Sequence, residues 1–420
     1  MADDLDFHSP QLICKVEDKK INLQGFLVMD TLLGGHCAGG IRMTPDVTEE
    51  EVKQLAWTMS MKFGFLNIYM GGAKAGIILS KNNSHESRDI ILKTFGQRIG
   101  FILKRGIYYP GTDIGTSERD LRLIEAGAGI KSAITAEDNN DSGYFTALVA
   151  VTVAREIAKC AGIDFKKAKV IIEGFGKVGS AIADLISDET TIIGLSTVKG
   201  AIVNNKGLDI GKVKEIKGIN GDDIISAYKD AETSSLDDLL ASDSDILFLC
   251  GKPRVLNLDN VNKIKAKIVI GAGNLCFEKG VEAACYHRGI YVLPDFVTSC
   301  GGVLGLTLKG MRLSFYNITK LIQEDFALKI NNLIKLSWPN GQSPVKMAPD
   351  MVRENISKMQ ELKVQKKQGT LRRTYDMLVG REWKSLTSRI ALHTVPGTYY
   401  YLPKIQDYLL LRARESFRWK

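Results

Sequence analysis

The chain has few of the residues that bind metal ions or form disulfide bonds. Its 420 residues include five histidines, and its seven cysteines are scattered without a Cys-x-x-Cys pair. No His-Glu-x-x-His motif is present, so the spacings typical of zinc sites are missing. An odd number of dispersed cysteines is typical of a reducing compartment, where thiols stay free. We therefore expect neither a metal site nor a disulfide framework.

Long apolar runs are also missing. No run approaches the ~18–20 residues that a membrane-spanning helix needs. The N-terminal stretch Met-Ala-Asp-Asp-Leu-Asp is acidic and has no apolar segment of the kind found in signal peptides. We expect a cytoplasmic protein that makes no contact with a membrane.

The positive charge of the chain is concentrated near its C-terminus. The net charge is +8, and residues 351–420 contain 15 Lys and Arg against 6 Asp and Glu, so the rest of the chain is near neutral. A basic segment of this kind is more often the solvated face of a helix than a nucleic-acid site. A nucleic-acid partner is therefore not expected.

The length and the order of patterns predict an α/β protein. A chain of 420 residues is too long for one ordinary core, so two domains are expected. From residue 169 onwards, short apolar strands alternate with helical patterns, which predicts a doubly wound sheet of about five or six strands. From residue 307 onwards the pattern is helical.

Two lysines lie twelve residues apart in the first part of the chain. Thr48-x-x-Glu51 predicts the start of a helix, and Lys62 falls on or beside its apolar face, formed by Val52, Leu55, Ala56, Met59 and Phe63. The alternative is that the stem of Lys62 runs along the surface and keeps the ammonium in water. We expect Lys74 in a turn flanked by Gly71, Gly72 and Gly76. A partly buried lysine near another cation has its neutral form favoured, and such a lysine can act on water or an imine.

An aspartate between small residues is the third candidate for chemistry. Asp113 follows a predicted strand and a Pro110-Gly111 turn, and Ser117-x-x-Asp120 predicts the start of the next helix. Aspartates in turns commonly bind backbone amides. We favour the other interpretation, in which Asp113 exchanges protons next to the two lysines.

A glycine-rich motif lies between a strand and a helix. The apolar segment 169–173 runs directly into Gly-x-Gly-x-x-Gly, and a helical pattern follows. In this context the glycines allow a tight turn and a close approach of the backbone to a pyrophosphate at the helix N-terminus. The predicted cofactor-binding residues of this motif are Gly174, Phe175, Gly176, Lys177, Val178 and Gly179.

The next strand ends without the acidic residue that commonly binds the ribose of NAD. Ser196 and Thr197 stand there, with Lys199 close by. A cation near this point could accept a 2′-phosphate, which favours NADP over NAD, while both nucleotides stay candidates. Asn274 and the segment 299–302 follow later strands, where such sheets bind ligands, although ordinary turn chemistry would also explain them.

The order of these motifs resembles the superfamily of glutamate, leucine, phenylalanine and valine dehydrogenases. The resemblance covers about residues 10–305. It rests on Gly39-Gly-Ile-Arg-Met, Met59-Ser-Met-Lys62, Gly71-Gly-Ala-Lys74-Ala-Gly, Asp113-Ile-Gly-Thr, the glycine-rich motif at 174–179, Lys199-Gly-Ala-Ile, Leu293-Pro-Asp-Phe and Gly301-Gly-Val.

The resemblance implies two domains about a cleft in a homo-oligomer. Residues 1–140 would bind the amino acid and carry subunit contacts. Residues 141–305 would form a Rossmann-type domain that binds NAD or NADP. Residues 306–420 would be helical and pack back on the first domain.

The resemblance also implies residue roles in the reversible deamination of an amino acid to a 2-oxo acid and ammonia. Lys62 would bind the substrate α-carboxylate, Lys74 would activate water, and Asp113 would exchange protons with the amino nitrogen. The other implied contacts with substrate or cofactor are Gly40, Ala38, Leu306, Asn274 and Thr146.

Three departures from the family pattern bear on the substrate. Glutamate enzymes have a lysine at the position of Ala38 and a serine at that of Leu306, so this chain would leave a glutamate side chain unpaired. We therefore expect an apolar amino acid, although Gly71-Gly-Ala-Lys74-Ala-Gly is closer to glutamate enzymes, and glutamate stays the alternative. Ser299 replaces the usual asparagine. A catalytically silent relative that senses a nucleotide or amino acid is the alternative from another class.

Overall fold

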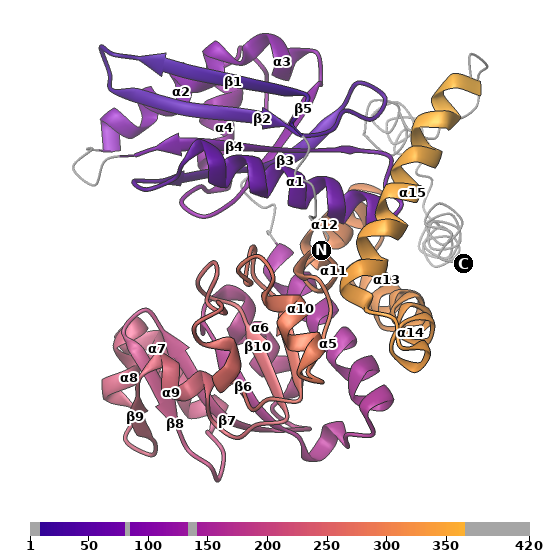
Figure 1. Cartoon of the computed structure of the whole chain (residues 1–420). Helices are drawn as coiled ribbons and strands as arrows, with labels where there is room; N and C mark the ends of the chain where they lie inside the picture. Colours follow the sequence, from indigo (N-terminus) through magenta and orange to yellow (C-terminus); the bar gives the residue numbers. More distant parts are fainter. Residues whose placement is uncertain (1–8, 80–84, 133–140, 366–420) are drawn as a thin grey trace, which may run out of the picture. The chain divides into compact units, whose positions relative to one another are not determined.

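The computed structural model describes residues 9–79, 85–132 and 141–365 (Figure 1). They form two compact units, one of residues 9–79, 85–132 and 351–365, and one of residues 141–350. Most of the basic C-terminal segment, residues 366–420, lies outside the described residues, and so does its predicted helical surface. In the described ranges, no helix is long and apolar enough to cross a membrane.

The first unit contains a five-stranded sheet in the order β1-β2-β4-β3-β5. β2 is antiparallel to β1 and β4, while β3 is parallel to β4 and β5. Pro110 and Gly111, predicted as a turn, lie within β5, where proline is tolerated because β5 is an edge strand. The strands are β1 (Leu12–Asp18), β2 (Leu23–Met29), β3 (Cys37–Thr44), β4 (Gly71–Ile78) and β5 (Tyr108–Thr112).

The two faces of this sheet pack against different helices. Ala73, Ala75 and Ile77 belong to the larger core, together with Phe95 of α2 and Ile124 of α4. The opposite face packs on α1 through a smaller cluster of Val28, Val47, Val52 and Ala56. The helices of this unit are α1 (Glu49–Phe65), α2 (His85–Arg98), α3 (Gly100–Lys104) and α4 (Glu118–Gly127), with the second part of α15 (Pro344–Gln365).

The prediction of a glycine-flanked turn at Lys74 was wrong. Residues 71–78 form the buried strand β4, and Gly39-Gly40 lies within the neighbouring strand β3. The glycines instead allow α1 to pack closely on the sheet. A Cβ atom on Gly72 would lie 2.1 Å from the Ser60 amide nitrogen.

Helix α1 begins where the sequence predicted. The Thr48 side chain accepts a hydrogen bond from the Glu51 amide at 3.2 Å. The Glu51 carboxylate does not complete the box but binds Arg42. Of the predicted apolar face, only Met59 is half-buried rather than buried.

The second unit contains a seven-stranded sheet in the order β12-β11-β10-β6-β7-β8-β9. β12 to β7 are parallel, and β8 and β9 continue the sheet by antiparallel pairing. The predicted number of five or six strands was too low, because β9 has only three residues and these are polar. The strands are β6 (Lys169–Glu173), β7 (Thr191–Thr197), β8 (Gly200–Val203), β9 (Glu232–Ser234), β10 (Ile246–Leu249), β11 (Ile268–Gly271) and β12 (Tyr291–Val292).

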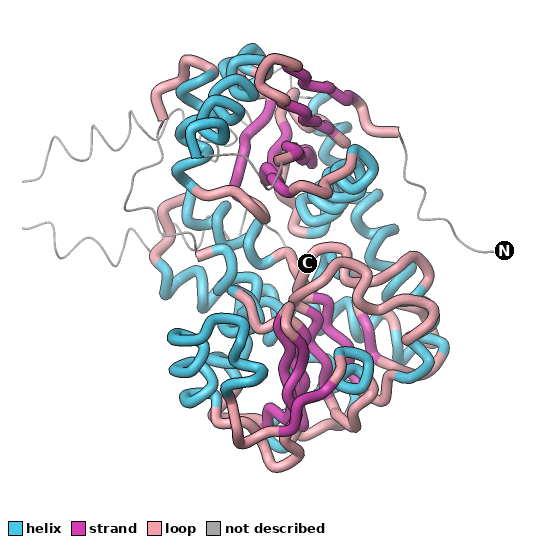
Figure 2. Tube along the Cα trace, turned by 90° about the vertical axis from the view of Figure 1, so that its left-hand side faces the viewer, coloured by secondary structure: helices cyan, strands magenta, loops and turns pink. Residues whose placement is uncertain are grey.

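Helices cover both sides of this sheet, as a doubly wound fold requires (Figure 2). Helix α12 (Gly301–Gly310) packs closely on helix α5 (Ser142–Ala161). A Cβ on Gly301 would lie 2.0 Å from the Phe145 carbonyl oxygen. The other helices are α6 (Lys177–Ile186), α7 (Ile210–Asn220), α8 (Ile224–Ala227), α9 (Leu236–Leu240), α10 (Val281–His287), α11 (Asp295–Thr298), α13 (Phe315–Leu321), α14 (Ala327–Leu336) and the start of α15.

The contact between α2 and α4 gives a test of the helix packing in the first unit. A Cβ on Gly96 would lie 1.9 Å from the Ile124 carbonyl oxygen, whereas the nearest atom to a Cβ on Gly100 is 3.4 Å away. We expect Gly96→Ala to lower the free energy of unfolding by about 3 kcal/mol, because two backbones must separate. Gly100→Ala is the matched control and should change it by less than about 1 kcal/mol. Denaturant unfolding measures both, and equal losses would contradict the close contact between α2 and α4.

Candidate active site

Three of the predicted site residues, Gly40, Lys74 and Asp113, lie in direct contact in the first unit. The Lys74 Nζ is 2.9 Å from the Asp113 Oδ2, and the two side chains are 5% and 11% exposed. A Cβ on Gly40 would lie 3.0 Å from the Asp113 Cβ and 3.3 Å from the Lys74 Nζ. The neighbouring parallel strands β3, β4 and β5 bring these residues together, and Gly40 leaves space beside the ion pair.

Asp113 has a second cationic partner that the sequence analysis did not assign. The Arg42 Nε donates to the same Oδ2 at 3.0 Å, and the Arg42 Nη1 donates to Glu51 of α1. Burial alone would raise the pKa of Asp113, but the charges and hydrogen bonds of Lys74 and Arg42 outweigh it and lower the pKa to about 2. The carboxylate is therefore ionised at neutral pH.

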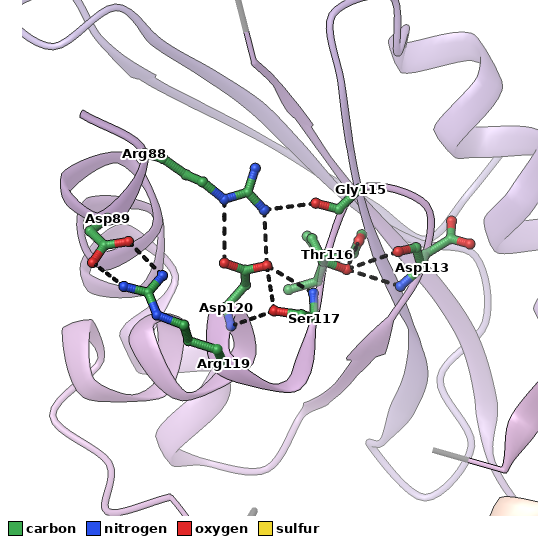
Figure 3. Close-up of polar contacts among 9 residues, drawn as sticks. Arg88, Asp89, Asp113, Gly115, Thr116, Ser117, Arg119 and Asp120 are labelled. Atoms are coloured by element: carbon green, nitrogen blue, oxygen red, sulfur yellow. Dashed lines mark hydrogen bonds and ion pairs between the residues drawn. The ribbon is translucent and has the colours of Figure 1, made fainter. Parts of the chain in front are cut away.

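The loop after β5 is braced by hydrogen bonds (Figure 3). The Thr116 hydroxyl donates to the Ile41 carbonyl at 2.7 Å and accepts from the Asp113 amide at 3.0 Å. Arg88 donates to the Gly115 carbonyl and to Asp120. Ser117 and Asp120 form the predicted capping box of α4. The Asp113 carboxylate is thus bonded to Lys74 and Arg42, while Thr116 bonds to the backbone of the turn.

Lys62 and Ala38 lie on the same side of the sheet as Lys74. Lys62 is 5% exposed in the last turn of α1, so its side chain does not run along the surface. Ala38 is half-buried on β3, two residues before Gly40 and therefore on the same face of the strand. The role of Lys62 in binding a carboxylate stays a prediction.

The glycine-rich motif of the second unit forms a tight turn at the end of β6. Gly174 has φ +86°, and a Cβ there would lie 2.4 Å from the Gly251 amide nitrogen. The Gly174 amide donates to the Ser196 hydroxyl oxygen at 3.0 Å, and the Phe175 amide donates to the Ser196 carbonyl at 2.6 Å. Ser196 therefore holds the turn from the neighbouring strand β7.

The residues of this turn fit a dinucleotide phosphate. Gly176 is the N-cap of α6, no side chain caps the helix there, and a Cβ on Gly176 would have no neighbour within 4 Å among the described residues. Gly179 packs the helix on the turn, since its Cβ would lie 2.2 Å from the Gly174 carbonyl oxygen. Lys177 is exposed and Val178 is half-buried. An open helix N-terminus of this kind binds anions.

Glu173 is a buried residue of this site that the sequence analysis missed. Its carboxylate accepts hydrogen bonds from the amides of Cys250, Gly251 and Lys252, and burial raises its pKa. These bonds join the loops after β6 and β10, where the strand order of the sheet reverses and where such sheets bind nucleotides. Its position at the end of an apolar strand was the only sequence signal.

Lys217 of α7 also contacts the motif and was missed. Its ammonium donates to the Phe175 carbonyl and lies 4.9 Å from the centre of the Phe175 ring. A lysine on a polar helix far along the chain gives no sequence signal for such a contact.

The structure adds a carboxylate to the predicted ribose-binding region. Lys199 is exposed, and its Nζ lies 4.0 Å from Asp223. The Thr197 hydroxyl donates to the Asp222 carbonyl at 3.1 Å. The cation that favoured NADP is therefore partly neutralised by an acidic residue that is distant in sequence.

The remaining predicted site residues also lie in the second unit. The Thr146 hydroxyl donates to the Ser142 carbonyl. A Cβ on Gly302 would lie 3.1 Å from the Thr146 hydroxyl oxygen. Leu306 is 43% exposed on α12, Asn274 is half-buried after β11, and the Ser299 hydroxyl donates to the Asp295 carbonyl. No group of His, Cys, Asp and Glu suited to a metal ion occurs in the described part of the chain.

The low pKa of Asp113 predicts how stability depends on pH. The ionised form stabilises the fold above the ordinary aspartate pKa of about 4, and this contribution is lost as the pH falls towards about 2. We expect Asp113→Asn to be less stable than the wild type at pH 6, because Lys74 and Arg42 lose their partner. The difference in the free energy of unfolding should shrink by about 2 kcal/mol between pH 5 and pH 2. Denaturant unfolding across this range measures it, and a constant difference would contradict the lowered pKa.

Comparisons with known proteins cover both units. The model of the Glu/Leu/Phe/Val dehydrogenase dimerisation domain matches residues 10–127, and that of Glutamate/Leucine/Phenylalanine/Valine dehydrogenase matches residues 140–343. The glutamate dehydrogenase of Thermotoga maritima is 30% identical over 295 residues, which are 66% of this chain and 70% of that protein. The NADP-specific glutamate dehydrogenase of Saccharolobus shibatae is 29% identical over 64% of this chain and 67% of its own length.

Solved structures show the same fold. The hetero-hexameric glutamate dehydrogenase of Thermus thermophilus, in its Leu-bound form, has a TM-score of 0.71 at 19% identity, with 84% of this chain and 89% of that chain covered. The L-tryptophan dehydrogenase of Nostoc punctiforme has a TM-score of 0.60 at 19% identity, with 84% and 97% covered. The chain belongs to the glutamate/leucine/phenylalanine/valine dehydrogenase family and is an NAD(P)-dependent amino-acid dehydrogenase.

Proposed function

We propose that the protein converts an L-amino acid with an apolar side chain to its 2-oxo acid and ammonia, reversibly. The buried contact of Lys74 with Asp113 beside Gly40 carries this proposal. It supplies a lysine and an ionised carboxylate within 2.9 Å of each other, next to a position without a side chain. Removing a proton from the substrate nitrogen and from the attacking water requires acid and base groups positioned in this way.

Each residue has a separate task in this proposal. Lys62 binds the α-carboxylate of the substrate. Asp113 starts ionised, takes a proton from the substrate ammonium and later returns it to the departing nitrogen. Lys74 pairs as an ammonium with Asp113 in the structure, so it must lose its proton before it takes one from the water that attacks the imine carbon. When bound, NAD⁺ or NADP⁺ supplies the acceptor for the hydride of the α-carbon.

The residues that would bind the nucleotide belong to the second unit. The amides at the N-terminus of α6, from Gly176 to Gly179, would face the pyrophosphate. Glu173, Ser196 and Lys217 hold the loop that presents these amides. Thr146 and Asn274 are proposed contacts near the nicotinamide and the substrate.

The preference for an apolar side chain rests on Ala38 and Leu306. Neither can pair with a second carboxylate, and an unpaired buried charge costs about 3–5 kcal/mol. Leucine-, valine- or phenylalanine-like substrates are therefore favoured. Glutamate is the second candidate, because the relatives from Thermotoga maritima and Saccharolobus shibatae are named glutamate dehydrogenases.

The division of labour between the parts of the chain is also a proposal. Residues 1–140 would bind the amino acid and join subunits of a homo-oligomer, which the name of the dimerisation-domain model supports. Residues 141–305 would bind the nucleotide.

A panel of substrates tests the function directly. Formation of NADH or NADPH is followed by absorbance with leucine, valine, phenylalanine, tryptophan and glutamate. We expect turnover with an apolar amino acid and a loss of more than about 10³-fold in kcat for Lys74→Met, because the base is removed. The double variant Ala38→Lys, Leu306→Ser should raise kcat/KM for glutamate relative to leucine. Turnover with glutamate alone would overturn the side-chain proposal, and no turnover would favour the silent relative.

Variants at Lys199 and Asp223 test the choice between NAD and NADP. We expect Lys199→Ala to raise the KM for NADP⁺ about tenfold, through loss of one phosphate contact, with little effect on the KM for NAD⁺. Asp223→Asn should lower the KM for NADP⁺, since it removes the nearby carboxylate. Equal changes for the two nucleotides in either variant would contradict a 2′-phosphate site at Lys199.

A further inference from the structure

Arg42 is a buried cation beside the proposed catalytic pair. It lies on β3, two residues after Gly40, and its side chain is 4% exposed. Its guanidinium bridges two carboxylates, with the Nε on Asp113 at 3.0 Å and the Nη1 on Glu51 in the first turn of α1. Both carboxylates are thereby tied to one rigid group.

The two cations hold the same oxygen of Asp113. Both the Lys74 Nζ and the Arg42 Nε lie within 3.0 Å of Oδ2. Among the described residues, the hydrogen bonds of this carboxylate all end on Oδ2, which leaves Oδ1 for another partner. The backbone of Asp113 is fixed as well, because Thr116 joins it to the Ile41 carbonyl. Ile41 and Arg42 are consecutive residues of β3. Ile41 fixes the main chain of Asp113 through Thr116, and Arg42 fixes its side chain.

We propose that Arg42 is a positioning residue for Asp113, which it orients so that Oδ1 exchanges the proton with the substrate nitrogen. Glu51 anchors Arg42 from α1. The inference rests on the proposed function, since it assigns a geometry to the proton exchange of Asp113.

The charges around Asp113 come from every element packed against it in the first unit. Lys74 approaches from β4, Arg42 from β3, and Glu51 of α1 acts through Arg42. Tyr108 of β5 stays neutral, because burial raises its pKa well above the ordinary value. Two cations against one carboxylate keep Asp113 ionised, so removal of Arg42 should make Asp113 easier to protonate.

The first experiment separates positioning from binding. For Arg42→Met we expect kcat with the best amino acid to fall at least tenfold while the KM for the amino acid changes less than threefold. Arg42→Lys keeps a charge but cannot bridge Asp113 and Glu51, so it should recover part of kcat. A KM effect with unchanged kcat, or no recovery by lysine, would overturn the proposal. Circular dichroism and thermal unfolding establish that each variant is folded.

A milder pair of variants covers the case in which Arg42→Met does not fold. Glu51→Gln keeps Arg42 and its charge but removes the negative charge that anchors Arg42, so kcat should fall about threefold or more. Glu50→Gln changes the preceding residue of the same helical turn, whose carboxylate pairs with Lys53 instead of Arg42, and should leave kcat unchanged. Equal behaviour of the two variants would contradict the anchoring role.

The second experiment needs no turnover and no cofactor. A carbodiimide activates protonated carboxyl groups, which then form an amide with added glycinamide or with a neighbouring lysine. Peptide mass spectrometry measures both products at Asp113, the glycinamide adduct and the amide with Lys74. At pH 5 we expect Arg42→Met to be modified at Asp113 about tenfold faster than the wild type, the change that one pKa unit produces. Glu51→Gln should not be faster. Equal rates in the wild type and Arg42→Met would overturn the inference even in an active enzyme, whereas faster labelling in a protein without turnover would count against the proposed function alone.

Discussion

Two cations share one carboxylate oxygen, and most of the first unit is arranged to make that contact. Lys74 and Arg42 lie on neighbouring strands, and Asp113 lies just beyond a third, so the contact requires β3, β4 and β5 to be adjacent and parallel. Gly40 leaves room between them. A buried ion pair is costly unless its geometry is good and its remaining bonds are made. Glu51 supplies a further bond to Arg42, and Thr116 fixes the backbone of Asp113.

In the second unit, hydrogen bonds rather than ion pairs hold two closely approaching loops together. Its loops after β6 and β10 approach so closely that Gly174 and Gly251 are almost in backbone contact. The amides of the second loop then need an acceptor, which Glu173 provides from the end of β6. Ser196 and Lys217 fix the first loop from two other elements. In the part of the chain that the structure describes, no side chain caps the start of α6, so its first amides are left available.

Local patterns predicted the fold better than they predicted the site. The start of α1 at Thr48 and the capping box at Ser117 follow from signals within a few residues, and the structure confirms them. The glycines around Lys74 were misread because close packing and turns use the same residue, and only the partner helix distinguishes them. Arg42, Glu173 and Lys217 could not be found, since each acts on a residue that is distant in sequence. The contact of Lys199 with Asp223 is of the same kind.

The proline in β5 has a consequence for how the first sheet ends. The Cys37 amide donates to the Ile107 carbonyl, so odd-numbered residues of this segment direct their polar backbone groups towards β3. Residue 110 therefore directs its backbone towards the open edge, where proline has no N–H to offer. A foreign strand that tried to extend the sheet there would miss a donor near its middle. The edge next to Asp113 is thus protected against the strand addition that leads to aggregation.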